Sequence, residues 1–248
     1  MTFLKRTHNF GVMADIRKIV AVVIAIACLL VIEAASRGYA NDSQNSAATM
    51  TPVTPTTHID LFNGKDLTGW AFWTKTDLKP EQIWTVQGGL LECAAEPTSY
   101  MRTLQSYENY TLTIVWRFIK VTPKSNNIGF LVHMQLPDQL RPVCIKCQGQ
   151  HDNQGGFWLY HGFECDQYKG PKTLENVHIP RPGDSNENPV GQWNTFVLVC
   201  DGRDVKFYVN GKLSNELTGC RPSSGSIGIQ TEGGQIEVSK IYIEPLTK

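Results

Sequence analysis

The sequence has no excess of charge of either sign, because 23 Lys and Arg residues stand against 23 Asp and Glu residues. Residues 1–40, which are treated below as a leader, carry five of the basic and two of the acidic residues, so that 18 positive and 21 negative charges remain. Proteins that bind DNA, RNA or anionic lipid electrostatically carry a surplus of Lys and Arg. The balance therefore argues against nucleic acid or a lipid surface as a partner.

The sequence also lacks an apolar run as long as a membrane-spanning helix. The longest run, Ile19–Ile32, has fourteen residues and ends at Glu33, whereas a span needs about 20. Basic residues precede this run, and Gly38 and Ala40 place small residues at the −3 and −1 positions, which is typical of a secretory signal cleaved after Ala40. Lipid attachment at Cys28 and an uncleaved anchor remain as alternatives. We expect an exported protein, periplasmic or extracellular, that touches a membrane only if this segment is retained or lipidated.

Several catalytic motifs are missing as well. The chain has no G-x-S-x-G elbow, no H-E-x-x-H and no P-loop, and it lacks the E-x-D-x-x-E run that brings two glycosidase carboxylates together. No amphipathic helical window of twelve residues stands out, and there is no internal repeat. Motifs alone therefore name no reaction.

The chain after the leader consists of short apolar or alternating runs separated by turn residues. Asp201-Gly202 and Asn210-Gly211 are hairpin signals, and the segment between them alternates with Val205, Phe207 and Val209 on one face. The further expected strands are Trp84–Val86, Leu90–Cys93, Tyr110–Phe118, Gly129–Met134, Phe157–His161, Thr195–Cys200, Ser226–Gln230 and Ile236–Ile243. This pattern predicts an all-β fold, a two-sheet antiparallel jelly-roll sandwich over residues 58–248, after a flexible linker at residues 41–57.

Six cysteines follow the leader, and an even number in an exported chain predicts at least one disulfide. Cys144 and Cys147 form a C-x-x-C pair, but turn residues follow it where a redox motif needs a helix. A zinc site would have to recruit Cys165, His151 and His161. Residues three apart on a strand point to opposite faces. We therefore interpret the pair as structural, with one member bonded to Cys165.

Side-chain alternation suggests a ligand-binding face. If residues 144–148 form a strand, Ile145 faces the core, and Lys146 and Gln148 face a groove. In Phe157-Trp158 one ring should enter the core and the other point outward. An outward Trp158 would offer a sugar ring a surface to stack on.

The chain resembles a known bacterial family in several segments that occur in the family's order. The segments are "DLFNGKDLTGW" (60–70), "WTVQGGLLEC" (84–93), "NIGFLVHM" (127–134), "IKCQ" (145–148), "GGFWL" (155–159), "SNENPVGQWNT" (185–195), "VKFYVNG" (205–211) and "GSIGIQTEGGQIEVSKIYIEPL" (225–246). The family is that of the 3-keto-disaccharide hydrolases, also described as 3-keto-glucoside lyases or hydratases. The resemblance implies a concanavalin-A-like jelly roll, in agreement with the strand pattern.

The resemblance also implies a chemistry. A 3-keto group acidifies the C2 proton of a glycoside, so that proton removal can expel the group at C1, and water can then add to the product. This reaction needs a general base, an acid for the leaving oxygen and a group that stabilises the enolate. A divalent metal ion or a cationic side chain could supply the last of these.

Matched to the family position by position, His133, Gln148 and Glu232 fall on site positions, and Glu187 is a further candidate. For Glu187 a loop-capping carboxylate is the alternative. The chain departs from the family at Lys146, where the family has Glu, at Gly156, where it has Asp, at Ser239-Lys240, where it often has Arg-Asn, and at Ile128, where it has Ser. Lys146 could hold an enolate in place of a metal.

These interpretations give one expected function and one alternative. The expected function is an exported hydrolase or lyase acting on 3-keto-glycosides, with catalytic Glu232, His133, Lys146 and Glu187, and with Gln148 and Trp158 binding the sugar. The alternative is a non-catalytic, lectin-like module that binds carbohydrate in the same groove.

Overall fold

The computed structural model describes residues 51–121 and 126–247. The expected signal segment and the first part of the expected linker lie outside the described residues. Within the described part, no helix is long and apolar enough to cross a membrane.

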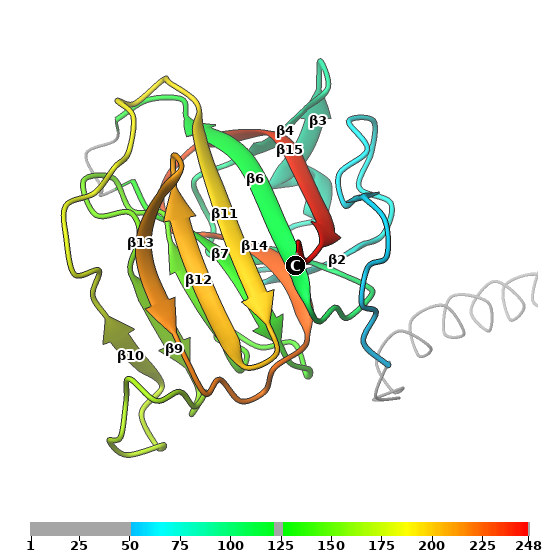
Figure 1. Ribbon diagram of the computed structural model, residues 1–248. Coiled ribbons are helices and arrows are strands. Elements are labelled where there is room, and N and C mark those ends of the chain that lie inside the picture. Colours follow the sequence, from blue (N-terminus) through cyan, green and yellow to red (C-terminus); the bar gives the residue numbers. More distant parts are fainter. Residues whose placement is uncertain (1–50, 122–125, 248) are drawn as a thin grey trace, which may run out of the picture. The chain divides into compact units, whose positions relative to one another are not determined.

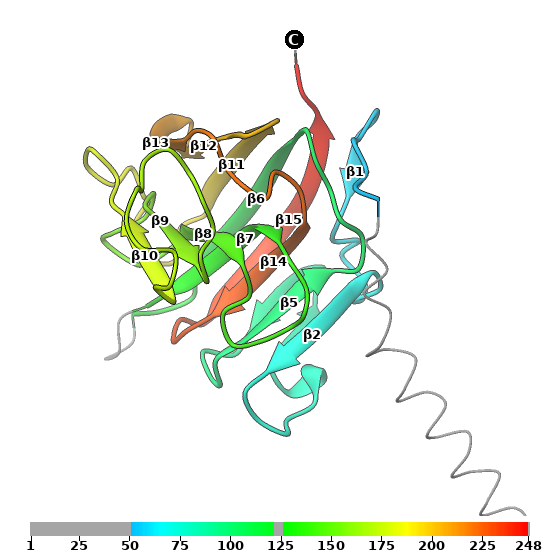
Figure 2. The same ribbon diagram turned by 90° about the horizontal axis from the view of Figure 1, so that it is seen from below.

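The described residues form two antiparallel sheets packed face to face (Figures 1 and 2). The eight-stranded sheet has the order β13-β12-β11-β6-β15-β4-β3, with β1 paired to β15. Its strands are β1 (Ile59–Asp60), β3 (Trp84–Gln87), β4 (Leu90–Cys93), β6 (Tyr110–Phe118), β11 (Asn194–Asp201), β12 (Asp204–Val209), β13 (Lys212–Leu217) and β15 (Ile236–Pro245). A 3-10 turn, η1 (Pro80–Gln82), precedes β3.

The seven-stranded sheet has the order β10-β9-β8-β7-β14-β5-β2, and Figure 2 shows most of its strands side by side. Its strands are β2 (Trp70–Thr74), β5 (Ser99–Thr103), β7 (Ile128–Met134), β8 (Cys144–Gln148), β9 (Phe157–Tyr160), β10 (Asn176–Ile179) and β14 (Ser226–Thr231). The two-sheet antiparallel sandwich predicted from the sequence is confirmed.

The core lies between the sheets and takes every second residue of each strand, as the pleat requires. Val205, Phe207 and Val209 are fully buried on β12, as their alternation predicts. Phe157 is likewise buried, and its neighbour Trp158 faces the other way and stays partly exposed, which confirms the predicted split of that dipeptide.

Several strands were not expected from the sequence. Strands β2, β5 and β13 are rich in polar or aromatic residues, as in Ser99–Thr103 and Lys212–Leu217, so that their apolar alternation is weak. The edge strand β10 contains His178 within a largely polar loop region. The fold also reaches into the expected linker, because Val53 pairs with Tyr107 and its amide donates to the Ser106 carbonyl at 2.9 Å.

None of the expected disulfides is present in the described residues. All six cysteines there are buried free thiols, namely Cys93, Cys144, Cys147, Cys165, Cys200 and Cys220. Cys147 points into the core from β8, and Cys144 lies on the opposite face, which is the predicted alternation. The predicted bond from this pair to Cys165 is therefore not formed; the Glu164–Arg221 bridge instead brings Cys165 beside Cys220.

Candidate functional site

The candidate site lies on the outer face of the seven-stranded sheet, the face turned away from the eight-stranded sheet. Strand register aligns two rows of side chains across this face. The first row runs His178–Trp158–Lys146–Leu131–Gly228–Arg102, and the second runs Gln148–Gly129–Gln230–Tyr100–Trp73. Two of the predicted site residues, Lys146 and Gln148, thus lie on one face as expected, with Ile145 and Cys147 in the core.

Lys146 is more buried than a lone lysine on a strand would be, since only 2% of its side chain is exposed. It runs over Gly129 of the neighbouring strand, where a Cβ would lie 2.4 Å from the Lys146 Cε. Glycine is therefore needed at position 129 for the lysine side chain to lie flat on the sheet.

The ammonium of Lys146 ends at the carboxylate of Glu232, with 2.5 Å between Nζ and Oε2. Asn127 Nδ2 donates to the same oxygen at 2.8 Å. Among the described residues, no donor contacts the other oxygen, Oε1, and 20% of the Glu232 side chain is exposed. Glu232 is thus a carboxylate with one oxygen fixed and the other free toward solvent.

Burial lowers the pKa of Lys146, because the charged form loses its hydration, and the carboxylate of Glu232 offsets part of this effect. The pair stays ionic only as long as both partners are in place. Because the Lys146 ammonium is buried, water does not screen its attraction to the Glu232 carboxylate.

Trp158 lies beside the lysine on β9, the side away from Glu232, and Gln148 lies on β8 next to Gly129, over which the lysine runs. The Trp158 ring stacks on His178, with 4.5 Å between centroids and 21° between planes. Gln148 Nε2 donates to Gln150 Oε1 at 2.9 Å, whereas its own buried Oε1 accepts no hydrogen bond from a described residue. That oxygen is a vacant acceptor at the floor of the site.

A loop crosses the other end of this face, and we call residues 135–143 the strap. Asp138 of the strap accepts two hydrogen bonds from Arg102, both at 2.7 Å, and one from the Tyr100 hydroxyl at 3.0 Å. At its far side, Gln139 Nε2 contacts His161 Nδ1 at 3.0 Å. The strap is thereby fixed over the β5 side of the face.

His133 lies apart from this group, although it was predicted to belong to the site. It has a φ of 53° beside a register shift between β7 and β14, and this bulge turns its ring onto the core residue Phe163, with 6.4 Å between centroids. Neither ring nitrogen bonds to a described residue, and burial lowers the pKa of His133 to about 4. The structure therefore gives His133 no contact with Lys146 or Glu232.

Glu187 braces a loop, as the alternative interpretation of this residue has it. Its Oε1 accepts from His151 Nδ1 at 2.7 Å and from the Asp152 amide at 2.8 Å, and its Oε2 accepts from the Ser185 hydroxyl at 2.9 Å. Its side chain is only 10% exposed. A carboxylate with both oxygens engaged in this way is a poor general base.

A divalent metal ion does not fit beside Glu232. The ammonium of Lys146 already occupies the position from which a cation would bind Oε2, and a second cation there would be repelled. Among the described residues, metal-ligand types gather at His151, Asp152 and Glu187, whose potential ligand atoms lie within 4.8 Å of one another. That group lies on the loop that Glu187 braces.

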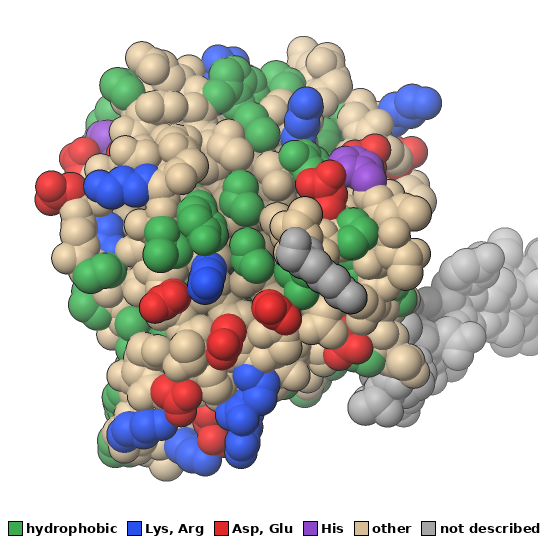
Figure 3. Space-filling view, viewed as in Figure 1, with side chains coloured by type: hydrophobic (Ala, Val, Ile, Leu, Met, Phe, Trp, Pro, Cys, Tyr) green, Lys and Arg blue, Asp and Glu red, His purple; other side chains and the backbone are tan. Residues whose placement is uncertain are grey.

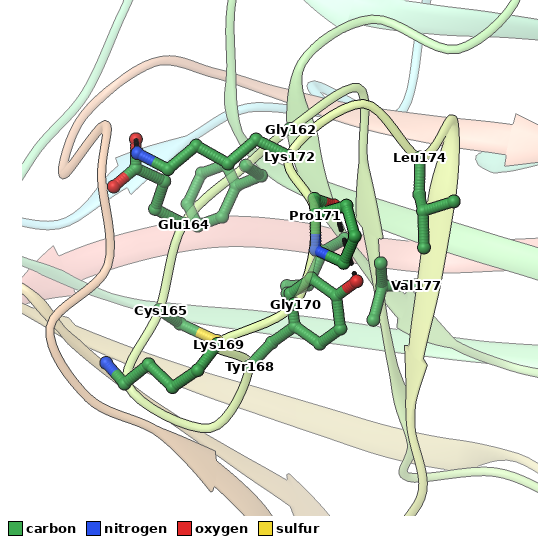
Figure 4. A pocket seen from close by; sticks show the side chains of 12 residues that line it. Gly162, Glu164, Cys165, Tyr168, Lys169, Gly170, Pro171, Lys172, Leu174 and Val177 are labelled. Carbon is green, nitrogen blue, oxygen red and sulfur yellow. Dashed lines mark hydrogen bonds and ion pairs between the residues drawn. The ribbon is translucent and has the colours of Figure 1, made fainter.

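Two other surfaces contain none of the residues predicted for the site. A cavity of about 190 Å³ lies under residues 162–174, walled by Phe163, Tyr168 and Val177 (Figure 4). On the face shown in Figure 3, which looks onto the eight-stranded sheet, basic and acidic side chains are interspersed.

Sequence reasoning missed two neighbours of Glu232 and Trp158. Asn127 was noted only as part of a family segment, and its bond to Glu232 joins residues 105 positions apart. His178 lies in an edge strand of four residues, too short for its alternation to be recognised. No local pattern could have placed either residue in the site.

The profile of the 3-keto-alpha-glucoside-1,2-lyase-like domain matches residues 57–244. A search of curated proteins found no match. Among solved structures, a protein from Parabacteroides distasonis assigned as a glycosyl hydrolase is 18% identical, with a TM-score of 0.55, over 77% of this chain and 94% of its own. An endo-acting O-glycanase from a member of the human gut microbiota is 12% identical, with a TM-score of 0.55, over 77% and 99%.

A third similar structure is the carbohydrate-binding module CBM66 from Bacillus subtilis, which is 12% identical, with a TM-score of 0.52, over 71% of this chain and 96% of its own. At these identities the structures share the sandwich fold with this chain, and the profile supplies the family. The chain belongs to the 3-keto-alpha-glucoside-1,2-lyase-like domain family.

Proposed function

We propose that the domain is a carbohydrate-active enzyme that cleaves 3-keto-glycosides by elimination at C1 and C2, followed by addition of water. Membership of the family supports this reaction, and the fold shared with glycan-active proteins supports a sugar as the ligand. The leader expected from the sequence would place the reaction outside the cytoplasm.

Glu232 is the general base of this proposal, and its geometry is the observation that carries it. Lys146 and Asn127 fix Oε2, so that the unpartnered Oε1 is presented toward solvent and can take the C2 proton. The keto group at C3 makes that proton acidic, and a positioned base typically contributes 10²–10⁴-fold to such a step.

Lys146 stabilises the enolate through its charge. Before the reaction its ammonium is neutralised by the Glu232 carboxylate. When Glu232 takes the C2 proton, its charge disappears and the buried ammonium is left facing the new negative charge on the substrate. The attraction is thus stronger in the transition state than in the resting site, which is the condition for catalysis rather than binding alone.

Gln148 and Trp158 would hold the sugar. The Oε1 of Gln148 is buried without a partner among the described residues, so that a rotation of the side chain would let it accept a hydroxyl hydrogen. The partly exposed indole of Trp158 offers apolar surface to the sugar. Both lie within one or two residue positions of Lys146 in the sheet.

The test uses residues 41–248 with an aryl 3-keto-glucoside, with a chelator and separately with added divalent metal. We expect release of the aglycone by the wild type, and a loss of about 10²-fold or more in Glu232→Gln. Glu237→Gln is the matched control, since Glu237 pairs with Arg117 on the eight-stranded sheet. If the wild type releases no aglycone in either condition but binds unoxidised glycans, the domain is a binding module and the proposal fails.

A further inference from the structure

The elimination proposed above needs an acid for the leaving oxygen, and none of the residues predicted from the sequence supplies one. We infer that His178 is this general acid, an inference that rests on the proposed function. His178 belongs to β10, the edge strand of the seven-stranded sheet beside β9 (Figure 1).

The strand register places His178 in the same row as the lysine of the site. His178 pairs with Trp158, and Trp158 pairs with Lys146, so that all three side chains point to the outer face. Two strand spacings amount to about 10 Å. Lys146 leans over Gly129 toward Glu232, away from β10. Gln148 lies between them, because its backbone amide bonds to the Gly156 carbonyl beside His178 and it pairs with Gly129 under the Lys146 side chain. We take the surface above Gln148, between His178 and the Lys146–Glu232 pair, as the place of the sugar ring.

The His178 ring is held in position and its nitrogens are free. It stacks on the Trp158 indole at 4.5 Å, and Nε2 lies 3.1 Å from the point where a Cβ on residue 156 would be. The backbone carbonyl of Gly156 in turn accepts a hydrogen bond from the backbone amide of Gln148 at 2.9 Å. The imidazole therefore lies next to the residue that pairs with the sugar-binding glutamine. His178 is exposed, and within residues 51–121 and 126–247 neither nitrogen has a hydrogen-bond partner.

The position of His178 explains why this chain has glycine at position 156, where the family has Asp. A side chain at position 156, such as the Asp of the family, would occupy the space of the His178 ring, because even a Cβ would lie 3.1 Å from Nε2. The loss of that carboxylate therefore makes room for an imidazole on the same face.

Each proton and electron pair of the elimination has a donor and an acceptor. Glu232 takes the C2 proton, and the C–H electron pair forms the enolate of the C3 ketone. The enolate returns its electrons to form the C1–C2 double bond as the C1–O bond breaks, and the leaving oxygen takes the proton from His178. The products are an unsaturated 3-keto sugar and a neutral alcohol, with Glu232 protonated and His178 neutral. In the addition of water, His178 accepts a proton from water and Glu232 returns one to C2.

The experiment compares two leaving groups in wild type and in His178→Phe, which keeps a ring on Trp158 but carries no proton. A nitrophenyl 3-keto-glucoside expels a stable phenolate, whereas methyl 3-keto-glucoside must expel methoxide unless an acid protonates it. We expect the variant to keep kcat/KM within about threefold for the nitrophenyl substrate and to lose about 10²–10⁴-fold for the methyl substrate. His58→Phe, an exposed histidine beside the eight-stranded sheet, is the matched control.

The outcomes separate the two proposals. Equal losses on both substrates would indicate a structural role for His178, and no loss on either would exclude any role; both results overturn the inference. A wild type inactive on both substrates would overturn the proposed function and the inference with it. The pH profile gives a second measurement on the methyl substrate alone: wild-type activity should decline at high pH, and that decline should be absent from the residual activity of His178→Phe.

Discussion

Lys146 is a nearly fully buried charge, and its counterion among the described residues, Glu232, is itself partly exposed. An ammonium in such a place is tolerated only because the carboxylate is 2.5 Å away. The stability of the domain and the chemistry of the site therefore depend on the same pair of atoms.

We predict that Glu232→Gln lowers the free energy of unfolding by about 2–3 kcal/mol, because it leaves the Lys146 charge buried without a counterion. Adding Lys146→Met should restore stability to within about 1 kcal/mol of wild type, because both charges are then absent. Urea denaturation of the two single variants and the double variant measures the coupling. Glu175→Gln, which removes an exposed partner of Arg141, should change stability by less than about 0.5 kcal/mol. Additive losses in the double variant would contradict this account.

His133 should make the domain sensitive to acid. Its pKa is about 4 in the folded chain and about 6.5 in the unfolded chain, so below pH 6.5 protons bind preferentially to the unfolded state. The contribution is complete above pH 6.5 and is lost progressively as the pH falls to 4, reaching about 3 kcal/mol. The free energy of unfolding of His133→Phe should fall less than that of wild type between pH 7 and 5. Parallel curves would refute the assignment.

Alternation correctly predicted which face each residue of β8 occupies, but not what lies above that face. Lys146 and Gln148 were expected in an open groove, and both are almost fully buried. The cause is long-range: Glu232 is 86 positions from Lys146 in the chain. His133 was expected in the site from the family resemblance, and at this position a bulge between β7 and β14 turns its ring toward Phe163.

At the level of elements, β7 and β8 form the floor of the site, and Gly129 of β7 leaves the space in which the Lys146 side chain lies. We predict that Gly129→Ala displaces the Lys146 side chain, since the new Cβ would lie within 2.8 Å of three of its carbons. The expected result is a loss of about 1–3 kcal/mol in stability, together with a loss of activity on 3-keto-glucosides. Gly183→Ala is the control, because nothing lies within 4 Å of its Cβ. A fully active Gly129→Ala would show that Lys146 need not lie over position 129.

The strap is held across the face by a bidentate ion pair between Arg102 and Asp138. We predict that Arg102→Lys loosens the strap, because an ammonium cannot reproduce the paired hydrogen bonds of the guanidinium. Amide hydrogen exchange in residues 135–143 should become faster, while β6 and β15 remain protected. Arg141→Lys, whose ion pair is exposed and 3.4 Å long, should leave exchange unchanged. Unchanged exchange in Arg102→Lys would show that the strap is held by its other contacts.

Clear apolar alternation predicted strands whatever their length, and strands with polar or mixed sequences were missed. Tyr110–Phe118 and Leu90–Cys93 were predicted with the bounds that the structure gives. Strands β5 and β10 were missed because their polar residues make hydrogen bonds or stacking contacts across the sheet, which a single-strand pattern does not reveal.

For the whole molecule, the six thiols are buried within a fold that holds them in place. Burial raises the pKa of Cys93 and Cys200 to about 12, so these thiols stay protonated near neutral pH. We predict that residues 41–248 react very slowly with a thiol reagent when folded, and that six thiols react once the chain is unfolded in denaturant. Fewer than six before reduction would indicate a disulfide, and peptide mass mapping would then identify its members.

The ion pair between Lys146 and Glu232 also constrains which substitutions the two positions can accept. A chain with an acidic residue at position 146 cannot keep the carboxylate at position 232 in the same contact, and a chain with a neutral residue at 146 leaves Glu232 without its cation. Positions 146 and 232 should therefore vary together among descendants of this sequence.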